Sequence, residues 1–222
     1  TAGFASVDQA ALTEGGKAVS ILLMLIGGSS GSTAGGIKTV TVLVLILFVA
    51  ARARGKDQVA VFKRTIPQNK IMDAATITTM VFAFAVLGAI FITATCPVGF
   101  VDALFETISG FTTTGASILT DVEALSHTSL LWRSFTHWIG GMGVLVFMMA
   151  IIPMSGGSNI NLMKAESPGP SVGKLVPKMK HTARILYLIY FALTLAQIIL
   201  LLLGDMPLFD SVATAFGTAG TG

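Results

Sequence analysis

The sequence has very little charge, and this scarcity defines the class of protein. Only 11% of the 222 residues are Asp, Glu, Lys or Arg, whereas 53% are hydrophobic and the mean hydropathy is +0.82. A soluble domain of this size cannot carry so much apolar surface without aggregating. The composition therefore predicts an integral membrane protein.

Cysteine and grouped histidines are also scarce, which excludes several kinds of site. The single cysteine, Cys96, rules out an internal disulfide bond and gives no metal-ligand cluster. The three histidines, His127, His137 and His181, are scattered without ligand spacing. We therefore expect no cofactor and no enzymatic activity. The basic residues flank apolar segments and form no face with interleaved aromatics, so nucleic-acid binding is not expected either.

Long runs without charge locate the membrane spans. Residues 74–101, 134–163 and 185–204 each lack Asp, Glu, Lys and Arg, and each reaches the length of about 20 residues that a bilayer helix needs. The predicted fold class is therefore an all-α integral membrane protein.

The N-terminal apolar region, residues 18–51, is too long for one straight span. A continuous helix would extend about 51 Å, against a hydrocarbon core of about 30 Å. Residues 27–36 hold five glycines and four hydroxyl residues, and each glycine weakens a helix by roughly 1 kcal/mol. The pattern predicts helices over residues 17–26 and 37–51 with an irregular segment between them. Such a segment lines water or is buried in protein; the alternative is a surface loop between two interfacial helices.

Basic residues predict the orientation in the membrane. Residues 52–70 and 164–184 hold 11 of the 14 Lys and Arg residues, so both linkers should be cytoplasmic. Residues 102–123 and 205–210 carry acidic residues and no basic ones. We expect these two segments on the outside.

Three short stretches rich in threonine and glycine recur along the chain. They are Thr1-Ala2-Gly3, Thr113-Thr114-Gly115 and residues 218–222. The first two are followed by the same Ile-Gly-Gly signature, with Gly27 placed 24 residues after Gly3 and Gly140 placed 25 residues after Gly115. This spacing indicates a structural repeat.

Short amphipathic segments precede two of these stretches. Residues 100–111 and 207–216 are too short to span a bilayer. A short helix that enters from the outside and ends at a glycine turn directs unpaired carbonyls, and the negative end of its dipole, at one place. Rings of carbonyls replace the hydration shell of a monovalent cation. The repeat therefore predicts re-entrant pore helices, each ending in a strand of a cation filter; the alternative is an extracellular loop with an interfacial helix.

At these residues the chain resembles the Trk/Ktr/HKT superfamily of potassium transporters, and most closely the bacterial Trk membrane subunits. The resemblance covers nearly the whole sequence and is most specific over residues 25–39, 105–117, 138–143 and 165–170. It implies four repeats of outer helix, pore helix with filter, and inner helix around one pore. It also implies potassium uptake by a multi-pass protein of the bacterial inner membrane.

The resemblance further implies which residues conduct and gate the ion. The K+ filter would consist of Thr1, Ala2, Gly3, Thr113, Thr114, Gly115, Thr221 and Gly222. The gate, an intramembrane loop that breaks the inner helix, would consist of Gly27, Gly28, Ser29, Ser30, Gly31, Ser32, Thr33, Gly35, Gly36 and Lys38. K+ would be the transported ion. The implied partners are membrane lipid, a second copy in a homodimer, and a cytosolic nucleotide-binding regulatory subunit.

The predicted segments occur in an order that departs from the family. Residues 1–51 resemble a filter end and the broken inner helix of a third repeat, followed by a cytoplasmic linker over 52–71. Residues 72–163 combine an outer helix of the fourth-repeat kind with a pore helix, filter and inner helix of the first-repeat kind. A second linker over 164–184 precedes the outer helix, pore helix and filter start of residues 185–222.

The change of order falls near residues 96–105. A permuted or recombined gene, an assembly artefact, or a fourth repeat that has come to resemble the first would each explain it. With one whole filter segment and two partial ones, the sequence reads as a fragment, and we expect that a lone chain does not close a four-part ring.

Individual charged residues have simpler interpretations beside the functional ones. Lys38 either takes part in gating or extends to the interface, as lysines near helix ends do. Arg133 either anchors the helix at the interface, forms a barrier or pairs with Glu106. Asp102 and Asp210 occupy equivalent starts of the two pore helices, where capping and dipole compensation explain them.

Two other functions remain open from the sequence. A secondary transporter with discontinuous helices around a midplane site also explains the broken helix, and it predicts a buried carboxylate in a span. A nonconducting fragment of a Trk-like protein explains why both ends of the sequence fall inside filter stretches.

Overall fold

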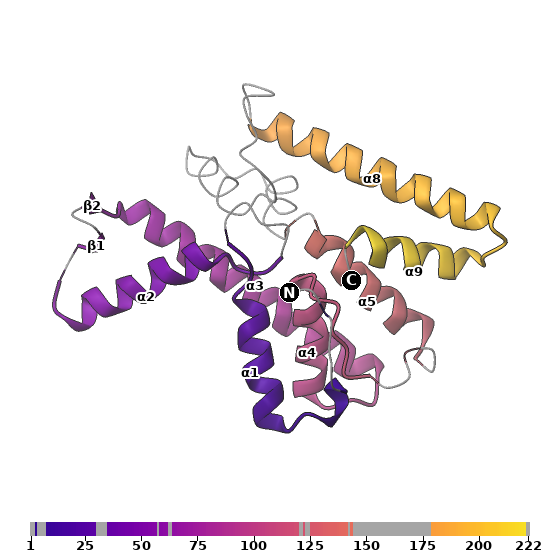
Figure 1. Ribbon diagram of the computed structural model, residues 1–222, viewed down its shortest axis with the longest axis horizontal. Helices are drawn as coiled ribbons and strands as arrows, with labels where there is room; N and C mark the ends of the chain where they lie inside the picture. Colours follow the sequence, from indigo (N-terminus) through magenta and orange to yellow (C-terminus); the bar gives the residue numbers. More distant parts are fainter. Residues whose placement is uncertain are drawn as a thin grey trace.

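A computed structural model of the chain describes Gly3, residues 8–29, 35–56, 58–61, 64–119, Val122, residues 125–141, Gly143 and residues 179–220. The regular secondary structure of these residues is helical apart from one small hairpin. Figure 1 shows α4 near the centre of the molecule, with α1 and α5 close to it and α8 and α9 beside each other at one side. The α2 helix and the start of α3 extend away from this centre as an arm.

The predicted break in the N-terminal helix is present. A 3-10 turn over Gln9–Ala11 leads into α1, which spans Glu14–Leu25, and α2 spans Thr39–Ala53. Thr13 caps α1 by accepting a hydrogen bond from the N–H of Gly16 at 3.2 Å. Neither helix has the length of about 20 residues needed to cross a bilayer. The two helices can therefore cross it only together, through the segment that joins them.

The linker after α2 contains a hairpin that the sequence did not predict. Strands β1 (Ala60–Val61) and β2 (Arg64–Thr65) pair in antiparallel fashion, with Ala60 opposite Thr65. Figure 1 shows the hairpin at the far end of the arm formed by α2 and α3.

Helix α3 spans Gln68–Thr95 and contains most of the predicted span of residues 74–101, which continues past the end of the helix. Its end has a physical cause at Cys96, whose backbone is extended (φ −128°, ψ 146°). Cys96 precedes Pro97, and a residue before proline is pushed out of the helical region. The chain therefore leaves α3 before the next short helix starts.

The short helix predicted over residues 100–111 is confirmed as α4, Phe100–Phe111. The second short helix, α9, spans Leu208–Ala219, and α8 before it spans Met179–Leu203. Helix α5 spans His127–Gly141 and starts before the predicted span of residues 134–163. The rest of that span lies outside the described residues, apart from Gly143.

Two helices in the described part of the chain are long and apolar enough to cross a membrane. They are α3, with a mean hydropathy of 2.3, and the 19 residues Ile185–Leu203 of α8, with a mean hydropathy of 2.5. Along α8 large aliphatic side chains are exposed, among them Leu188, Leu200 and Leu203 at 67%, 68% and 77%. Such a surface suits lipid rather than water.

The core forms around α4. Phe105 and Ile108 are 0% and 1% exposed and pack with Ile21 and Met24 of α1 and Ala85 of α3. A second cluster joins Ala89 and Ile92 of α3 to Ala103 at the start of α4. Because hydrophobic neighbours surround it, α4 is a buried helix at the centre of the described residues.

Gly140 allows α5 to approach the end of α4. A Cβ atom added at Gly140 would lie 2.7 Å from the carbonyl oxygen of Phe111 and 2.8 Å from that of Gly110. We expect Gly140→Ala to force the helices apart and to lower the free energy of unfolding by about 1–3 kcal/mol. Thermal unfolding in detergent measures this effect.

Gly15 provides the matched control for that substitution. It also lies in a helix, and a Cβ added there meets nothing within 4 Å. Gly15→Ala should leave the unfolding temperature unchanged or raise it slightly. Equal unfolding temperatures for the two variants would contradict the close approach of α5 to α4.

Candidate ion filter

The central threonine and glycine stretch begins at the end of α4. The N–H of Thr113 donates to the carbonyl of Gly110 and the N–H of Thr114 donates to the carbonyl of Ser109, each at 2.9 Å. These bonds form a Schellman-type helix end. Thr113, with φ 54°, occupies the left-handed position where glycine is usual.

Left-handed backbone recurs two residues later, at Gly115 with φ 76°. In a regular strand successive carbonyls alternate between the two sides, and a left-handed residue at every second position breaks this alternation. A β-branched residue rarely adopts positive φ, so contacts must hold Thr113 in place. Its Oγ1 donates to the carbonyl of Thr112 at 2.7 Å and accepts from the N–H of Gly35 at 3.1 Å.

The remaining hydroxyls of this stretch are also paired and buried. Thr112 Oγ1 donates to the carbonyl of Ile108 at 2.7 Å and lies 2.8 Å from Thr114 Oγ1. Thr112, Thr113 and Thr114 are 0%, 3% and 5% exposed. Since buried polar groups with partners have defined positions, these hydrogen bonds hold the stretch after α4 in one conformation.

Two of the three predicted filter stretches meet in the structure. Gly3 has φ 67°, and a Cβ atom added there would collide with the carbonyl oxygen of Thr114. The N-terminal stretch therefore passes directly against the central one. Thr1 and Ala2, which belong to the same predicted filter strand, lie outside the described residues.

The third stretch lies against α5. A Cβ atom added at Gly220 would collide with the carbonyl oxygen of His137, and one added at Gly141 would lie 3.1 Å from the carbonyl oxygen of Ala219. The predicted filter residues Thr221 and Gly222 follow directly but lie outside the described residues. The structure thus brings Gly3 and Gly115 to one region. The described part of the third stretch, which ends at Gly220, lies beside α5.

The loop predicted as a gate is closed at its base. Ile26 and Ile37 form a parallel bridge, in which the N–H of Gly27 donates to the carbonyl of Ile37 at 2.8 Å and the N–H of Ile37 donates to that of Leu25 at 3.0 Å. Gly36 is left-handed with φ 79°. The two half-helices therefore stay together although the helix is interrupted.

The end of this loop touches the filter strand. The N–H of Gly35 donates to Thr113 Oγ1, and a Cβ atom added at Gly35 would collide with the carbonyl of Thr112. This contact places Gly35 against the residues that follow α4. Of the predicted gate residues, Gly27, Gly28, Ser29, Gly35, Gly36 and Lys38 are described, whereas Ser30, Gly31, Ser32 and Thr33 lie outside the described residues.

Three interpretations of charged residues are corrected by the structure. Lys38 is only 2% exposed, so it does not extend to the interface. Asp102 and Asp210 lie in the first turns of α4 and α9, where an acidic residue compensates the helix dipole as predicted. The predicted capping is wrong, because the cap residues are Gly99 and Pro207 and make no side-chain cap bond. The long-range ion pair of Asp102 with Lys17, which local patterns do not reveal, accounts for the case of Asp102.

Asp102 is half-buried and forms an ion pair with α1. Lys17 Nζ lies 2.6 Å from Asp102 Oδ1 and 3.1 Å from Glu14 Oε1. Lys17 precedes both long apolar helices, and its hydrogen bonds to Asp102 and then Glu14 raise the pKa of its amine above the usual range. The lysine therefore stays protonated, and the pair ties the start of α4 to α1.

Arg133 pairs with Glu106, which was the less favoured of the sequence interpretations. Arg133 Nε donates to Glu106 Oε2 at 2.8 Å. Glu106 Oε1 also accepts from Ser117 Oγ and from the N–H of Ile118, each at 2.7 Å. The sequence did not predict these last two contacts, because they join residues 11 and 12 positions apart across the turn of the filter.

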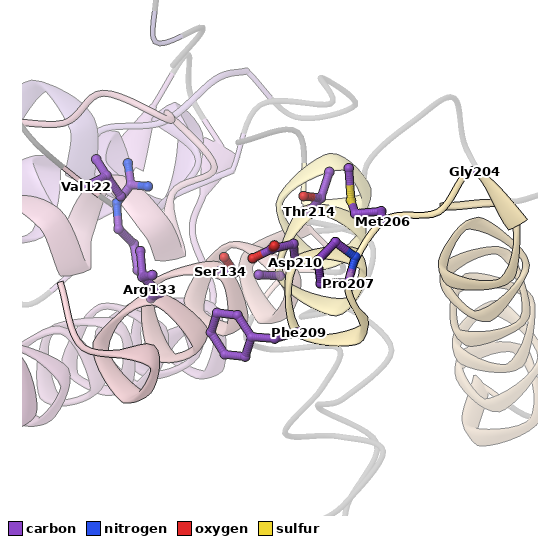
Figure 2. Close-up of a pocket in the computed structure, with 11 residues that line it drawn as sticks. Val122, Arg133, Ser134, Gly204, Met206, Pro207, Phe209, Asp210 and Thr214 are labelled. Atoms are coloured by element: carbon purple, nitrogen blue, oxygen red, sulfur yellow. The ribbon is translucent and has the colours of Figure 1, made fainter. Parts of the chain in front are cut away.

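A cavity of about 650 Å³ lies between α5 and α9, beside the turn that follows α8. Figure 2 shows Arg133 and Ser134 on the α5 side and Asp210 and Thr214 on the α9 side. Leu130, which also lines the cavity, lies 10 residues before Gly140, and Lys17 lies 10 residues before Gly27. Leu130 on α5 and Lys17 on α1 therefore occupy equivalent positions of the predicted repeat. Helix α5 therefore has a leucine at the position where α1 has Lys17. Asp102 forms an ion pair with Lys17, whereas Asp210 lines the cavity.

Composition, apolar helices and short helices ending at threonine and glycine turns together define a helical membrane protein. A family model described as "TrkH: Cation transport protein" matches the chain in two segments, residues 1–98 and 94–218. The chain belongs to this TrkH family of cation transport proteins. The two matched segments meet at residues 94–98, next to the predicted change of repeat order.

Individual relatives agree with the family match. The Trk system potassium uptake protein TrkH of Salmonella typhimurium is 42% identical over 122 residues, and TrkG of Escherichia coli is 41% identical over 124 residues. These alignments cover 54% and 55% of this chain but only 25% and 26% of the relatives. The crystal structure of the potassium transporter TrkH from Vibrio parahaemolyticus matches 93% of this chain and 40% of that chain, with 25% identity and a TM-score of 0.48.

Proposed function

We propose that the chain forms part of a potassium uptake protein, in which carbonyl oxygens of the threonine and glycine stretches select the ion. One observation carries this proposal: the strand after α4 has left-handed backbone at Thr113 and Gly115 and passes against Gly3 of a second such stretch. Neutral carbonyl dipoles replace the hydration shell of K+ without trapping it. Relatives named as potassium uptake proteins support the choice of ion.

The proposed gate is the loop between α1 and α2. It reaches the filter strand at the contact between Gly35 and Thr113, and the hydrogen bonds at its base restrain both ends. A loop in this place obstructs the path of an ion that leaves the filter. Rearrangement of the loop alone, without separation of α1 from α2, then opens the pathway.

The surroundings of the pore follow from the same proposal. The protein is placed in the bacterial inner membrane as a multi-pass homodimer, with lipid around α3 and α8. The basic linkers face the cytoplasm and receive a cytosolic nucleotide-binding regulatory subunit. Residues 1–51, 72–163 and 185–222 contribute to the pore, and residues 52–71 and 164–184 are the cytoplasmic linkers.

The secondary-transporter alternative has less support. It requires a carboxylate near the middle of a span. The carboxylate that α3 contains, Asp73, is the sixth residue of a 28-residue helix and therefore lies close to one end. We keep potassium conduction as the single proposed function.

Growth of a potassium-uptake-deficient bacterium tests the proposal. We expect the full-length gene to restore growth at low external K+, and not to do so when Gly3 is replaced by Ala, because the added Cβ collides with the Thr114 carbonyl. Gly15→Ala, which adds a Cβ into open space, is the control and should rescue like the unaltered gene.

Membrane expression has to be measured in every strain of this experiment. Expression of the unaltered protein without rescue would contradict potassium uptake. Rescue by Gly3→Ala to the same extent as by Gly15→Ala would contradict the packing of two filter strands.

A further inference from the structure

We propose that Glu106 is a positioning residue that holds the strand leaving the filter, and that Arg133 fixes Glu106 in the required orientation. The inference rests on the proposed filter and adds a determinant of selectivity to it. It concerns residues that line neither the ion path nor the loop between α1 and α2.

Glu106 is a buried carboxylate with a partner on each oxygen. It lies in the middle of α4 and is 2% exposed. Oε1 accepts hydrogen bonds from Ser117 Oγ and the Ile118 N–H at 2.7 Å each, and Oε2 accepts from Arg133 Nε at 2.8 Å. A buried carboxylate is costly unless it is paired and hydrogen-bonded, so these contacts explain how an acidic residue is tolerated there.

The contacts of Oε1 lie just beyond the filter glycine. Ser117 and Ile118 follow Gly115 by two and three residues. Between them and the glycine, Ser109 Oγ donates to the carbonyl of Ala116 at 2.5 Å. Since Glu106 and Ser109 are three residues apart, they share one face of α4. One helix face therefore holds the strand after the filter.

The strand is consequently fixed at both ends by the same helix. At its start, the N–H groups of Thr113 and Thr114 bond to the last turn of α4. At its far end, Ile118 bonds to Glu106. The carbonyls between these points have little freedom to move, and discrimination between ions of different radius requires such a defined site.

Arg133 connects this arrangement to α5. Its side chain is 21% exposed and lines the cavity beside α9, so it is accessible from the outer side, whereas Glu106 is not. The guanidinium group is always charged and holds Glu106 through a charge-assisted hydrogen bond. A neutral side chain at position 106 would leave this cation without its anionic partner. It would also weaken the hydrogen bonds to Ser117 and Ile118 that hold the strand.

The arrangement is specific to one of the two short helices. Glu106 is the seventh residue of α4, and the seventh residue of α9, which has the same length of 12, is Thr214. A threonine is too short to reach a strand in the way that Glu106 does. The structure thus assigns the carboxylate support to the central filter stretch within the described residues.

Ion selectivity of the full-length protein in a potassium-uptake-deficient strain tests the inference. The quantity measured is the ratio of K+ to Na+ uptake per amount of protein in the membrane. We expect Glu106→Gln to lower this ratio about tenfold, the factor that corresponds to one hydrogen bond made by a charged group. Ser117→Ala, which removes one of the three donors and leaves Arg133 paired, should lower it less but in the same direction.

Asp102→Asn is the matched control for a lost carboxylate. It lies on the same helix and loses its contact with Lys17, but it does not contact the filter strand; we expect an unchanged K+ to Na+ ratio. A residue that only stabilises the fold changes the amount of protein and not this ratio.

The outcomes separate this inference from the proposed function. If the unaltered protein takes up K+ selectively and Glu106→Gln keeps its ratio, the inference is overturned and the potassium function stands. If Glu106→Gln does not reach the membrane, Ser117→Ala decides, and an unchanged ratio there overturns the inference. Failure of the unaltered protein to transport K+ removes the proposed function itself.

Discussion

Gly115→Ser is expected to abolish potassium uptake while leaving the protein in the membrane. Gly115 has φ 76°, a conformation that costs a residue with a side chain about 1–2 kcal/mol. The strand must either accept this cost or rotate its peptide groups, and rotation moves the carbonyls away from the ion. Growth at low external K+ and tracer uptake in the same cells measure the loss.

Gly55 is the matched control for this substitution. It is also left-handed, with φ 67°, but a Cβ atom added there meets nothing within 4 Å, and it lies in the linker after α2. Gly55→Ser should raise the conformational free energy of the backbone by a comparable amount, but far from the filter, so we expect uptake to be preserved. Equal loss of uptake in both variants would show that general destabilisation is responsible, and it would contradict a specific role for Gly115.

Removal of the loop from Ser29 to Gly35 should raise the rate of potassium flux. The base of the loop is already joined by the bonds between Gly27, Leu25 and Ile37, so the shortened chain can connect without moving α1 from α2. We expect an increase on the order of fivefold or more, the lower end of a conformational coupling of about 1–3 kcal/mol. Initial rates of K+ uptake at equal protein amount measure it.

A combined variant shows whether the increased flux passes through the filter. Deletion of the loop together with Gly115→Ser should transport no potassium, because the opened gate still leads to a distorted filter. High flux in this combined variant would indicate a leak around the pore, and unchanged flux in the deletion alone would contradict the gate.

Local patterns in the sequence predicted the helices well where glycine, proline or polarity bounded them. The range of α4, residues 100–111, was predicted because an amphipathic run lies between Gly99 and a stretch of threonines. The break between α1 and α2 followed from the accumulation of glycines in residues 27–36. The charge-free run of residues 74–101 continues past the end of α3, because Pro97 ends the helix without interrupting the apolar run.

Contacts between distant residues were not predictable in this way. Lys17 pairs with Asp102 over 85 positions, and Gly35 bonds to Thr113 over 78. Their side chains and amides meet only because α1 and its loop pack on α4. A pattern of neighbours along the chain therefore indicated a cap at Asp102 and did not reveal its ion pair with α1.

The repeated glycines have a role that their sequence pattern only partly revealed. Spacing alone identified Gly27 and Gly140 as equivalent members of a repeat. In the structure both permit close contact, Gly27 with the carbonyl of Gly35 and Gly140 with the carbonyl of Phe111. Each lies where an inner segment meets backbone next to the filter, and this explains why a residue without a side chain occupies both places.

The change of repeat order remains a proposal about the gene. Helix α3 packs against α4 through Ala89, Ile92 and Ala103. Sequencing of the source DNA across residues 96–105 tests whether the order is genuine. A continuous reading frame there supports a permuted or recombined gene or a fourth repeat that has come to resemble the first, whereas an interrupted one indicates an artefact of assembly.

Flux into lipid vesicles that contain the purified full-length protein tests the central claim most directly. Vesicles with the unaltered protein are predicted to take up K+ in clear preference to Na+, and those with Gly115→Ser to lose that uptake. Equal entry of the two ions, or K+ uptake that does not change with Gly115, would contradict a filter formed by the threonine and glycine stretches.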